Sequence, residues 1–247
     1  MEVMTLQMIS PDQIILWKWA FIIINATLLF TWLVMGILVG ASFLITRRLS
    51  AGTRIPRWQN LLEVIVGAMR EQIREVTEED TDEYLPFIGT IFLFILTSNL
   101  LFIIPGYVTP TASLTTTAAL AVCVFLAVPI YGIRKQGIVN YLKEYFQPIF
   151  IFFPFHVMGE FSRTLALAVR LFGNMMSHEK VIAILLAITP LLFPVAMHIL
   201  GLLIGGIQAY IFAILAMVYI ASATGAHHEK QPSAAVPSEA VKLASAK

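Results

Sequence analysis

Long apolar stretches, separated by short polar or charged ones, make up most of this chain. Three of them run over residues 14–45, 84–104 and 118–133, and two longer ones follow at 158–188 and 195–223. A membrane-spanning helix needs about 20 apolar residues, so each stretch predicts one span. The last two predict helices about 45 Å long at 1.5 Å per residue, which exceeds the roughly 30 Å hydrocarbon core. We therefore expect them to form a strongly tilted helical hairpin.

One further segment has a mixed pattern. Between Trp58 and Thr77, apolar residues such as Ile65, Met69 and Ile73 recur at helical spacing, while charged residues interrupt them. This pattern predicts an amphipathic helix that is too polar to span and lies on the membrane surface. The same helix is also compatible with docking of a partner subunit. A short amphipathic connector is expected at 137–147.

Composition narrows the class of protein. The chain has 247 residues, of which 58% are hydrophobic and only 13% charged, and its mean hydropathy is +0.83. These values exclude an ordinary soluble domain and predict an all-α polytopic membrane protein with about five transmembrane helices plus amphipathic surface helices. No basic cluster with interleaved aromatics points to nucleic acid. The single cysteine, Cys123, forms no internal disulfide, and no metal-ligand or cofactor motif occurs.

The distribution of basic residues predicts the topology. Arg47, Arg48 and Arg54 follow the first span, and Arg134 and Lys135 follow the third. By the positive-inside rule both loops are cytoplasmic, so the N-terminus lies outside and the C-terminus lies in the cytoplasm. We expect an outer N-terminal lead at 1–13, a membrane-embedded domain at 14–225 with its hairpin at about 158–223, and a disordered cytoplasmic tail at 226–247.

The first long helix of the hairpin carries the charge that needs an explanation. Arg170 lies within an apolar run, and a charge at the bilayer centre costs roughly 2.5–3.5 kcal/mol, which makes it a functional-site hypothesis. Arg170, Gly173, Asn174 and Ser177 share one helical face, whereas Glu179, nine residues on, lies on nearly the opposite face. The two charges are separated by roughly 13 Å along the axis. This spacing suits two separate polar access routes better than one binding pocket.

The second long helix contributes one polar side chain in the middle of its run, Gln208. The glycines before it, Gly201, Gly205 and Gly206, allow another helix to approach closely. We expect Gln208 to lie across the hairpin from Arg170 and to hydrogen-bond its guanidinium. Tyr219 lies on nearly the same face as Gln208, three turns further on.

The residues alone leave three interpretations to weigh at this point. Arg170 can be a structural residue that pairs with Glu160 or Glu179 and holds a bundle together. The chain can also be a secondary transporter that uses an intramembrane Arg/Glu site, although no repeat relates its two halves. An intramembrane enzyme would need a nucleophile motif or a metal motif, and neither GxSxG nor HExxH occurs.

Several motifs together resemble one family. RLFGN at Arg170–Asn174, Glu179 five residues later, and GIQAYIFAILAMVYI at Gly206–Ile220 resemble subunit a of the F-type ATP synthase membrane sector, the ATPase A chain family. SNLLFIIPG at Ser98–Gly106 and PTASLTTTAALA at Pro110–Ala121 support the resemblance. The likeness extends from the first span to Ala223.

The resemblance implies a function. It implies an ion-translocating stator subunit with two offset half-channels that load and unload the carboxylates of a ring of c subunits. Arg170 would separate the half-channels and couple ion flow to rotation, Glu179 would belong to the outer half-channel, and Asn174 and Gln208 would be the polar residues beside the arginine. The implied partners are the c ring, b-type peripheral stalk subunits and membrane lipid. ATP chemistry would belong to other subunits, so the chain itself would be non-catalytic.

Other polar residues have weaker assignments under the same resemblance. His178 and Ser177 are candidates for the relay near Glu179 and Arg170. Arg163 and Glu160 either line the cytoplasmic route or mark the helix entry near the headgroups, and Tyr219 is a further candidate.

Departures from the family pattern leave two questions open. Ser113 and Thr115 stand where many relatives have Asp and Asn, and Gly201 stands where some have His. The coupling ion, H⁺ or Na⁺, therefore stays open. The expected location is a bacterial inner membrane, with a thylakoid membrane as the alternative.

Overall fold

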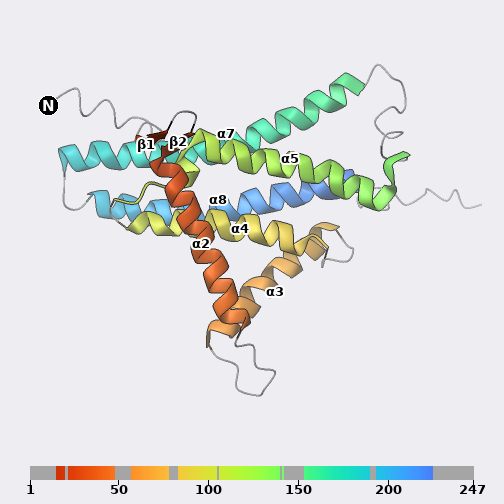
Figure 1. The fold of residues 1–247 in the computed structure, drawn as a ribbon, viewed down its shortest axis with the longest axis horizontal. Helices are drawn as coiled ribbons and strands as arrows, with labels where there is room; N and C mark the ends of the chain where they lie inside the picture. The colour runs from red at the N-terminus through yellow and green to blue at the C-terminus, as the bar shows by residue number, and fades with distance from the viewer. Residues whose placement is uncertain are drawn as a thin grey trace, which may run out of the picture.

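Four long helices run side by side along the long axis of the molecule (Figure 1). They are α4 (Leu85–Leu100), α5 (Leu114–Gln136), α7 (Phe153–Ile188) and α8 (Phe193–Ala223). The computed structural model describes residues 15–19, 22–47, 57–77, 83–104, 106–139, 141, 153–189 and 193–224. Within this bundle α8 packs against α4, α5 and α7, and α5 packs along α7.

The predicted fold class is confirmed. Five helices among the described residues are long and apolar enough to cross a membrane: the four of the bundle and α2 (Ala26–Thr46), which leans away from it (Figure 1). Large apolar side chains on α2 are exposed, with Trp32 at 65% and Val39 at 68% of their full accessibility. Such a surface is stable only when lipid or another apolar partner covers it, as expected of a multi-pass membrane protein.

The first span begins later than the predicted residue 14. Residues Ile15–Trp19 (β1) and Ile22–Asn25 (β2) form a two-stranded antiparallel hairpin, with Trp19 opposite Ile22. Aromatic and β-branched residues dominate both strands, and these residue types favour extended backbone. Apolarity alone did not distinguish this segment from the helix that follows it. The expected N-terminal lead, the cytoplasmic tail, and most of the connector at 137–147 lie outside the described residues.

The predicted amphipathic helix is confirmed as α3 (Arg57–Thr77). Ile73 is buried, while Glu63 and Arg70 are exposed, and the helix packs against α4 and α8. An apolar cavity of about 210 Å³ lies between the three helices. The two polar residues at its wall satisfy each other, because the Tyr210 hydroxyl donates a hydrogen bond to Oε1 of Gln72. Each of these two polar residues is therefore engaged in a hydrogen bond.

The core lies where α8 meets α4. Phe212, Ala216 and Ile220 of α8 are fully buried, as is Ile95 of α4. Small residues along α8 allow the helix backbones to approach, which is how packing stabilises helices in a membrane.

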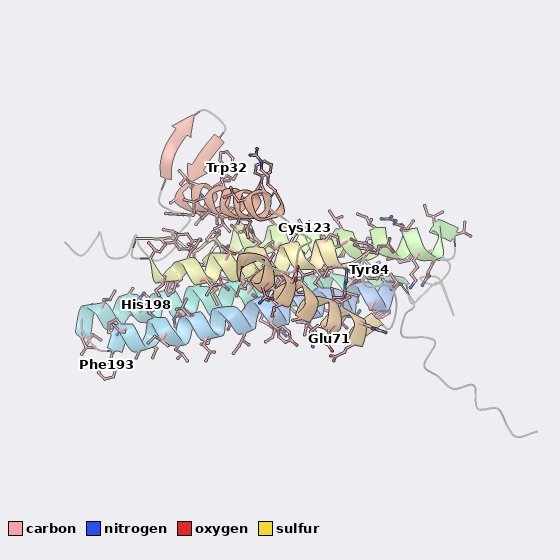
Figure 2. The ribbon with its side chains drawn as sticks, turned by 90° about the horizontal axis from the view of Figure 1, so that it is seen from below. Trp32, Glu71, Tyr84, Cys123, Phe193 and His198 are labelled. Carbon is pink, nitrogen blue, oxygen red and sulfur yellow. The ribbon has the colours of Figure 1, made fainter. Side chains whose placement is uncertain are left out.

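A compact loop closes one end of the bundle. After α4 come η3 (Leu101–Ile103), a turn at Gly106 with φ of 87°, and η4 (Pro110–Ala112). This loop packs against α7 and α8 close to the point where the two helices connect. We call this the hairpin end. Figure 2 shows Phe193 and His198 there, and Tyr84 toward the opposite, far end, where α8 finishes.

Candidate functional site

The helix α7 holds Arg170 on a side that faces away from the bundle. Arg170 is exposed, whereas Leu171 and Met175 on the packed side are buried. A Cβ added at Gly173, one turn on from Arg170, would meet no atom within 4 Å. Among the described residues, the Arg170 guanidinium makes no hydrogen bond or ion pair. A permanently charged side chain thus extends outward from an apolar helix, with open space beside it.

Gln208 of α8 is almost fully buried, at 3% exposure. Its Oε1 accepts a hydrogen bond of 2.9 Å from Nδ2 of Asn174 on α7. The hydrogen bond expected between Gln208 and Arg170 is not the one formed. Asn174 lies at the border between the exposed and packed sides of α7, so its short amide side chain can reach α8, while the longer arginine extends outward. Asn174 and Gln208 are therefore brought together, with Arg170 one turn away.

Glu179 lies in a different environment, at the hairpin end. Its Oε1 is buried and has no hydrogen-bond partner within the described part of the chain. A small cavity of about 10 Å³ adjoins it, which is about the volume needed for one water molecule. The cavity is lined by Asn99, Phe102, Thr109, Met175, His178, Glu179 and Gly201. The helix thus places Arg170 outward and Glu179 inward. The nine-residue spacing predicted that they lie on nearly opposite faces, but Arg170 was expected to face α8.

His178 adjoins the same cavity and packs tightly against α8. A Cβ at Gly201 would overlap its imidazole ring, so glycine is required at that position if the ring is to keep its place. The Phe102 ring lies between two histidines, with centroid distances of 5.8 Å to His178 and 5.0 Å to His198. The buried Nε2 of His178 has no partner among the described residues, so the ring adds one more unsatisfied polar atom beside Glu179.

Asn99 is a buried polar residue that the sequence prediction did not assign to the site. Its Nδ2 donates to the Gly205 carbonyl at 2.9 Å, and its Oδ1 accepts from the Thr111 hydroxyl at 2.6 Å. It thereby ties α4 to α8 and to η4 above the cavity. A lone amide within an otherwise apolar span is the sequence signal that could have identified it.

Nearer the far end, the polar residues of α7 are partly open. Arg163 pairs with Glu160 at 3.3 Å, and its guanidinium carbon lies 5.8 Å from the centre of the Tyr219 ring. Half of the Arg163 side chain is exposed. Ser177 and Lys180 are exposed too, although they lie close to Glu179 in the sequence, toward the hairpin end. The predicted site residues therefore do not converge on one pocket, and they divide into an exposed set and a set enclosed at the hairpin end.

Comparison with known proteins places this arrangement in a family. The family model for the ATP synthase A chain matches residues 28–221. The chain is 60% identical to ATP synthase subunit a 2 of Acaryochloris marina over 216 residues, covering 87% of this chain and 92% of the relative. It is 56% identical to ATP synthase subunit a of Nitrosospira multiformis over 221 residues, with coverage of 90% and 88%.

A third relative, ATP synthase subunit a 1 of Chlorobaculum parvum, is 58% identical over 216 residues, with coverage of 87% and 96%. The matched region includes α2, α3 and all four helices of the bundle, and so contains both the exposed set around Arg170 and the enclosed set around Glu179. The chain belongs to the ATP synthase A chain family.

Proposed function

We propose that this chain is the ion-translocating stator subunit of an F-type ATP synthase. In this proposal two offset half-channels load and unload the carboxylates of a c-subunit ring, and Arg170 separates them. The subunit performs no covalent chemistry. Its partners are the c ring, the b-type peripheral stalk and membrane lipid, in a bacterial inner membrane with the N-terminus outside.

The observation that carries the proposal is the exposed position of Arg170. A guanidinium keeps its charge at any physiological pH, and a charge facing hydrocarbon is costly unless an anion meets it. Within the described part of this chain no carboxylate pairs with it. A carboxylate carried past this face by a neighbouring subunit would satisfy the charge. The apolar exposed residues around it on α7, such as Leu165 and Val169, suit contact with another apolar helix.

The position of Glu179 supports the second half of the proposal. Its carboxyl is buried on the other side of α7, roughly 13 Å along the helix from Arg170. An ion entering at the hairpin end and one leaving at the far end would therefore pass on either side of a fixed positive charge. Each elementary charge that crosses the membrane carries about 2.3 kcal/mol per 100 mV. This work can drive rotation only when the direct route is closed.

The experiment is ion translocation by vesicles that contain the complete complex, comparing wild type with Arg170→Ala. ATP-driven uptake of H⁺ and of Na⁺ would be followed in parallel, together with passive leak through the membrane sector under an imposed potential. We expect coupled uptake to be lost and leak to rise. The ion taken up by the wild type would identify the coupling ion.

Arg134→Ala is the matched control. Arg134 is also exposed, but it pairs with Glu83 at the far end of α5, so its loss should leave coupling intact. Full coupled transport by Arg170→Ala would refute the proposal. The arginine would then be structural, and a secondary transporter with an intramembrane Arg/Glu site would become the leading alternative.

A further inference from the structure

The apolar cavity between α3, α4 and α8 has no part in the proposed function. Ten of its twelve lining residues are apolar, and the other two, Gln72 and Tyr210, are hydrogen-bonded to each other. Its volume of about 210 Å³ is about fifteen times the volume that one water molecule needs. Cavities of this size are rare between packed protein elements. The cavity therefore indicates a place for another molecule.

The chemistry of the lining favours an apolar molecule over water. A buried water needs two to four polar partners, and the polar groups nearest the cavity already serve one another: Gln72 accepts from Tyr210 and donates to Glu75. In another protein, an apolar cavity of about 150 Å³ stays dry and binds a molecule the size of benzene. Two methionines in the wall, Met69 and Met217, can adapt their flexible side chains to a guest of irregular shape.

The width of the cavity favours a hydrocarbon chain over a further helix. The helix α3 crosses the bundle obliquely (Figure 2), and it packs closely on α4 at Met69, whose methyl would lie 3.7 Å from a Cβ added at Gly89. On α8, the Tyr210 hydroxyl is hydrogen-bonded to Gln72 of α3. A helix is about 10–12 Å across, so it cannot enter between α3 and α8 while this bond holds. A single chain of methylene groups can.

The cavity is continuous with apolar surface that is exposed. Leu203 and Ile207 of α8 lie seven and three residues before Tyr210, on the same helical face, and all three are exposed. On the α3 side, Ala68 lines the cavity and is itself exposed. Lipid hydrocarbon covers such a surface in a membrane protein. An acyl chain can therefore enter the cavity directly from the bilayer.

We propose that this cavity binds one acyl chain of a membrane phospholipid, which packs between the amphipathic helix α3 and the spanning helices α4 and α8. The chain gains van der Waals contacts with walls such as Phe92 and Met217. The exposed part of α3 carries both signs of charge, as at Glu71 and Arg74, so the site selects the chain and not one headgroup. This inference goes beyond the proposed function and does not depend on Arg170.

A phospholipid with a photoreactive diazirine on its acyl chain tests the site. Vesicles that contain this lipid and the complete complex would be irradiated, and the labelled peptides identified by mass spectrometry. We expect label in the wild type on the peptides that contain Met69 and Met217. Val39 of α2, which is 68% exposed, serves as the reference for ordinary contact with lipid.

Ala68→Phe should remove the label from the cavity, because its ring fills the space from an exposed position and requires no change in the core. Val64→Phe is the matched control. Val64 is on the same helix and 63% exposed, but it does not line the cavity, so the label should remain. Labelling at Val39 should be the same in both variants and in the wild type.

Lipid retention gives a second measurement. After washing in detergent, native mass spectrometry should find one phospholipid fewer on the Ala68→Phe complex than on the wild type or on Val64→Phe. In vesicles of mixed zwitterionic and anionic lipids, the retained lipid should have the headgroup composition of the bulk. Strong enrichment of one headgroup would overturn the assignment of the site to the chain.

The inference is also overturned if the label reaches Val39 of the wild type but not the cavity peptides. A transmembrane helix of a neighbouring subunit would then cover the cavity. Equal labelling of the cavity in Ala68→Phe and the wild type would overturn it as well. Neither result bears on the stator role, which Arg170→Ala tests separately through coupled transport, and loss of that role would leave the lipid site unaffected.

Discussion

The two halves of the α7–α8 hairpin treat their charged residues differently. At the hairpin end, η3 and η4 cover Glu179, and its buried oxygen has no partner among the described residues. Nearer the far end, Glu160 and Arg163 pair with each other and remain partly open. One half thus builds an enclosed polar site from this chain alone. The other half leaves its polar residues for solvent or for a neighbouring subunit.

The difference indicates that the two halves of the hairpin have different roles in the assembly that we propose. An enclosed site needs its walls held in place, so substitutions there should affect stability as well as transport. An open face needs only the right charge in the right place, so substitutions there should leave the fold of this chain almost unchanged. The predictions below test this contrast through the free energy of unfolding, from the largest expected effect to the smallest.

Asn99→Ala should give the largest loss of stability, roughly 2 to 4 kcal/mol, because it leaves the buried Thr111 hydroxyl without its acceptor and removes packing beside Gly205. Thermal unfolding of the detergent-solubilised complex would measure it. Thr90→Ala is the control, because Thr90 is exposed and only bonds its own helix at Pro86. Equal stability of the two variants would show that the enclosed half does not depend on this connection.

Gly201→Ala should cost about 1 to 3 kcal/mol, the usual range for overpacking a filled site. The added methyl would overlap the His178 imidazole, whereas at Gly206 the nearest atom to a new Cβ is 4.0 Å away, on Leu96. Gly206→Ala is therefore the matched control and should be tolerated. The double variant Gly201→Ala with His178→Ala should recover most of the loss. Failure of that rescue would mean that another contact of Gly201 limits the site.

The sequence predicted features of these two regions that depend on one helix, and it missed features that depend on contacts between helices. Spacing along one helix is a local property, so nine residues of separation predicted that Arg170 and Glu179 lie on nearly opposite faces of α7, but not which of the two faces outward. The hydrogen-bond partner of Gln208 could not be predicted in this way, because it depends on how far the side chains of one helix extend toward the other. The residues that enclose Glu179 were missed for the same reason, since Asn99, Phe102 and Thr109 come from α4, η3 and the loop before η4.

The same reasoning holds for the fold. Runs of about 20 apolar residues predicted the five spans, because the thickness of the bilayer imposes that length. The extended hairpin before α2 was missed, since its residues are as apolar as those of the helix that follows. Only their β-branched and aromatic character separates the two segments, and that is a weaker signal than hydropathy.

Asn174→Ala tests the boundary between the two halves. It removes the donor to the buried Oε1 of Gln208, and the expected loss is about 1 kcal/mol, the usual net value of a hydrogen bond. Ser177→Ala, on the exposed side of the same helix, should change stability by less than about 0.5 kcal/mol. If the two variants lost equal stability, Asn174 would belong to the open face of α7 and not to the enclosed half.

Glu160→Gln should produce the smallest effect, below about 1 kcal/mol, because one partner of the pair that it breaks, Arg163, is half exposed. The Arg163 guanidinium keeps its contact with the Tyr219 ring, which limits the loss further. Unfolding would be compared at low and high salt, since screening should remove the difference between variant and wild type. A loss above 2 kcal/mol that persists in high salt would mean that the pair is enclosed in the assembled complex, and the contrast between the two halves would then fail.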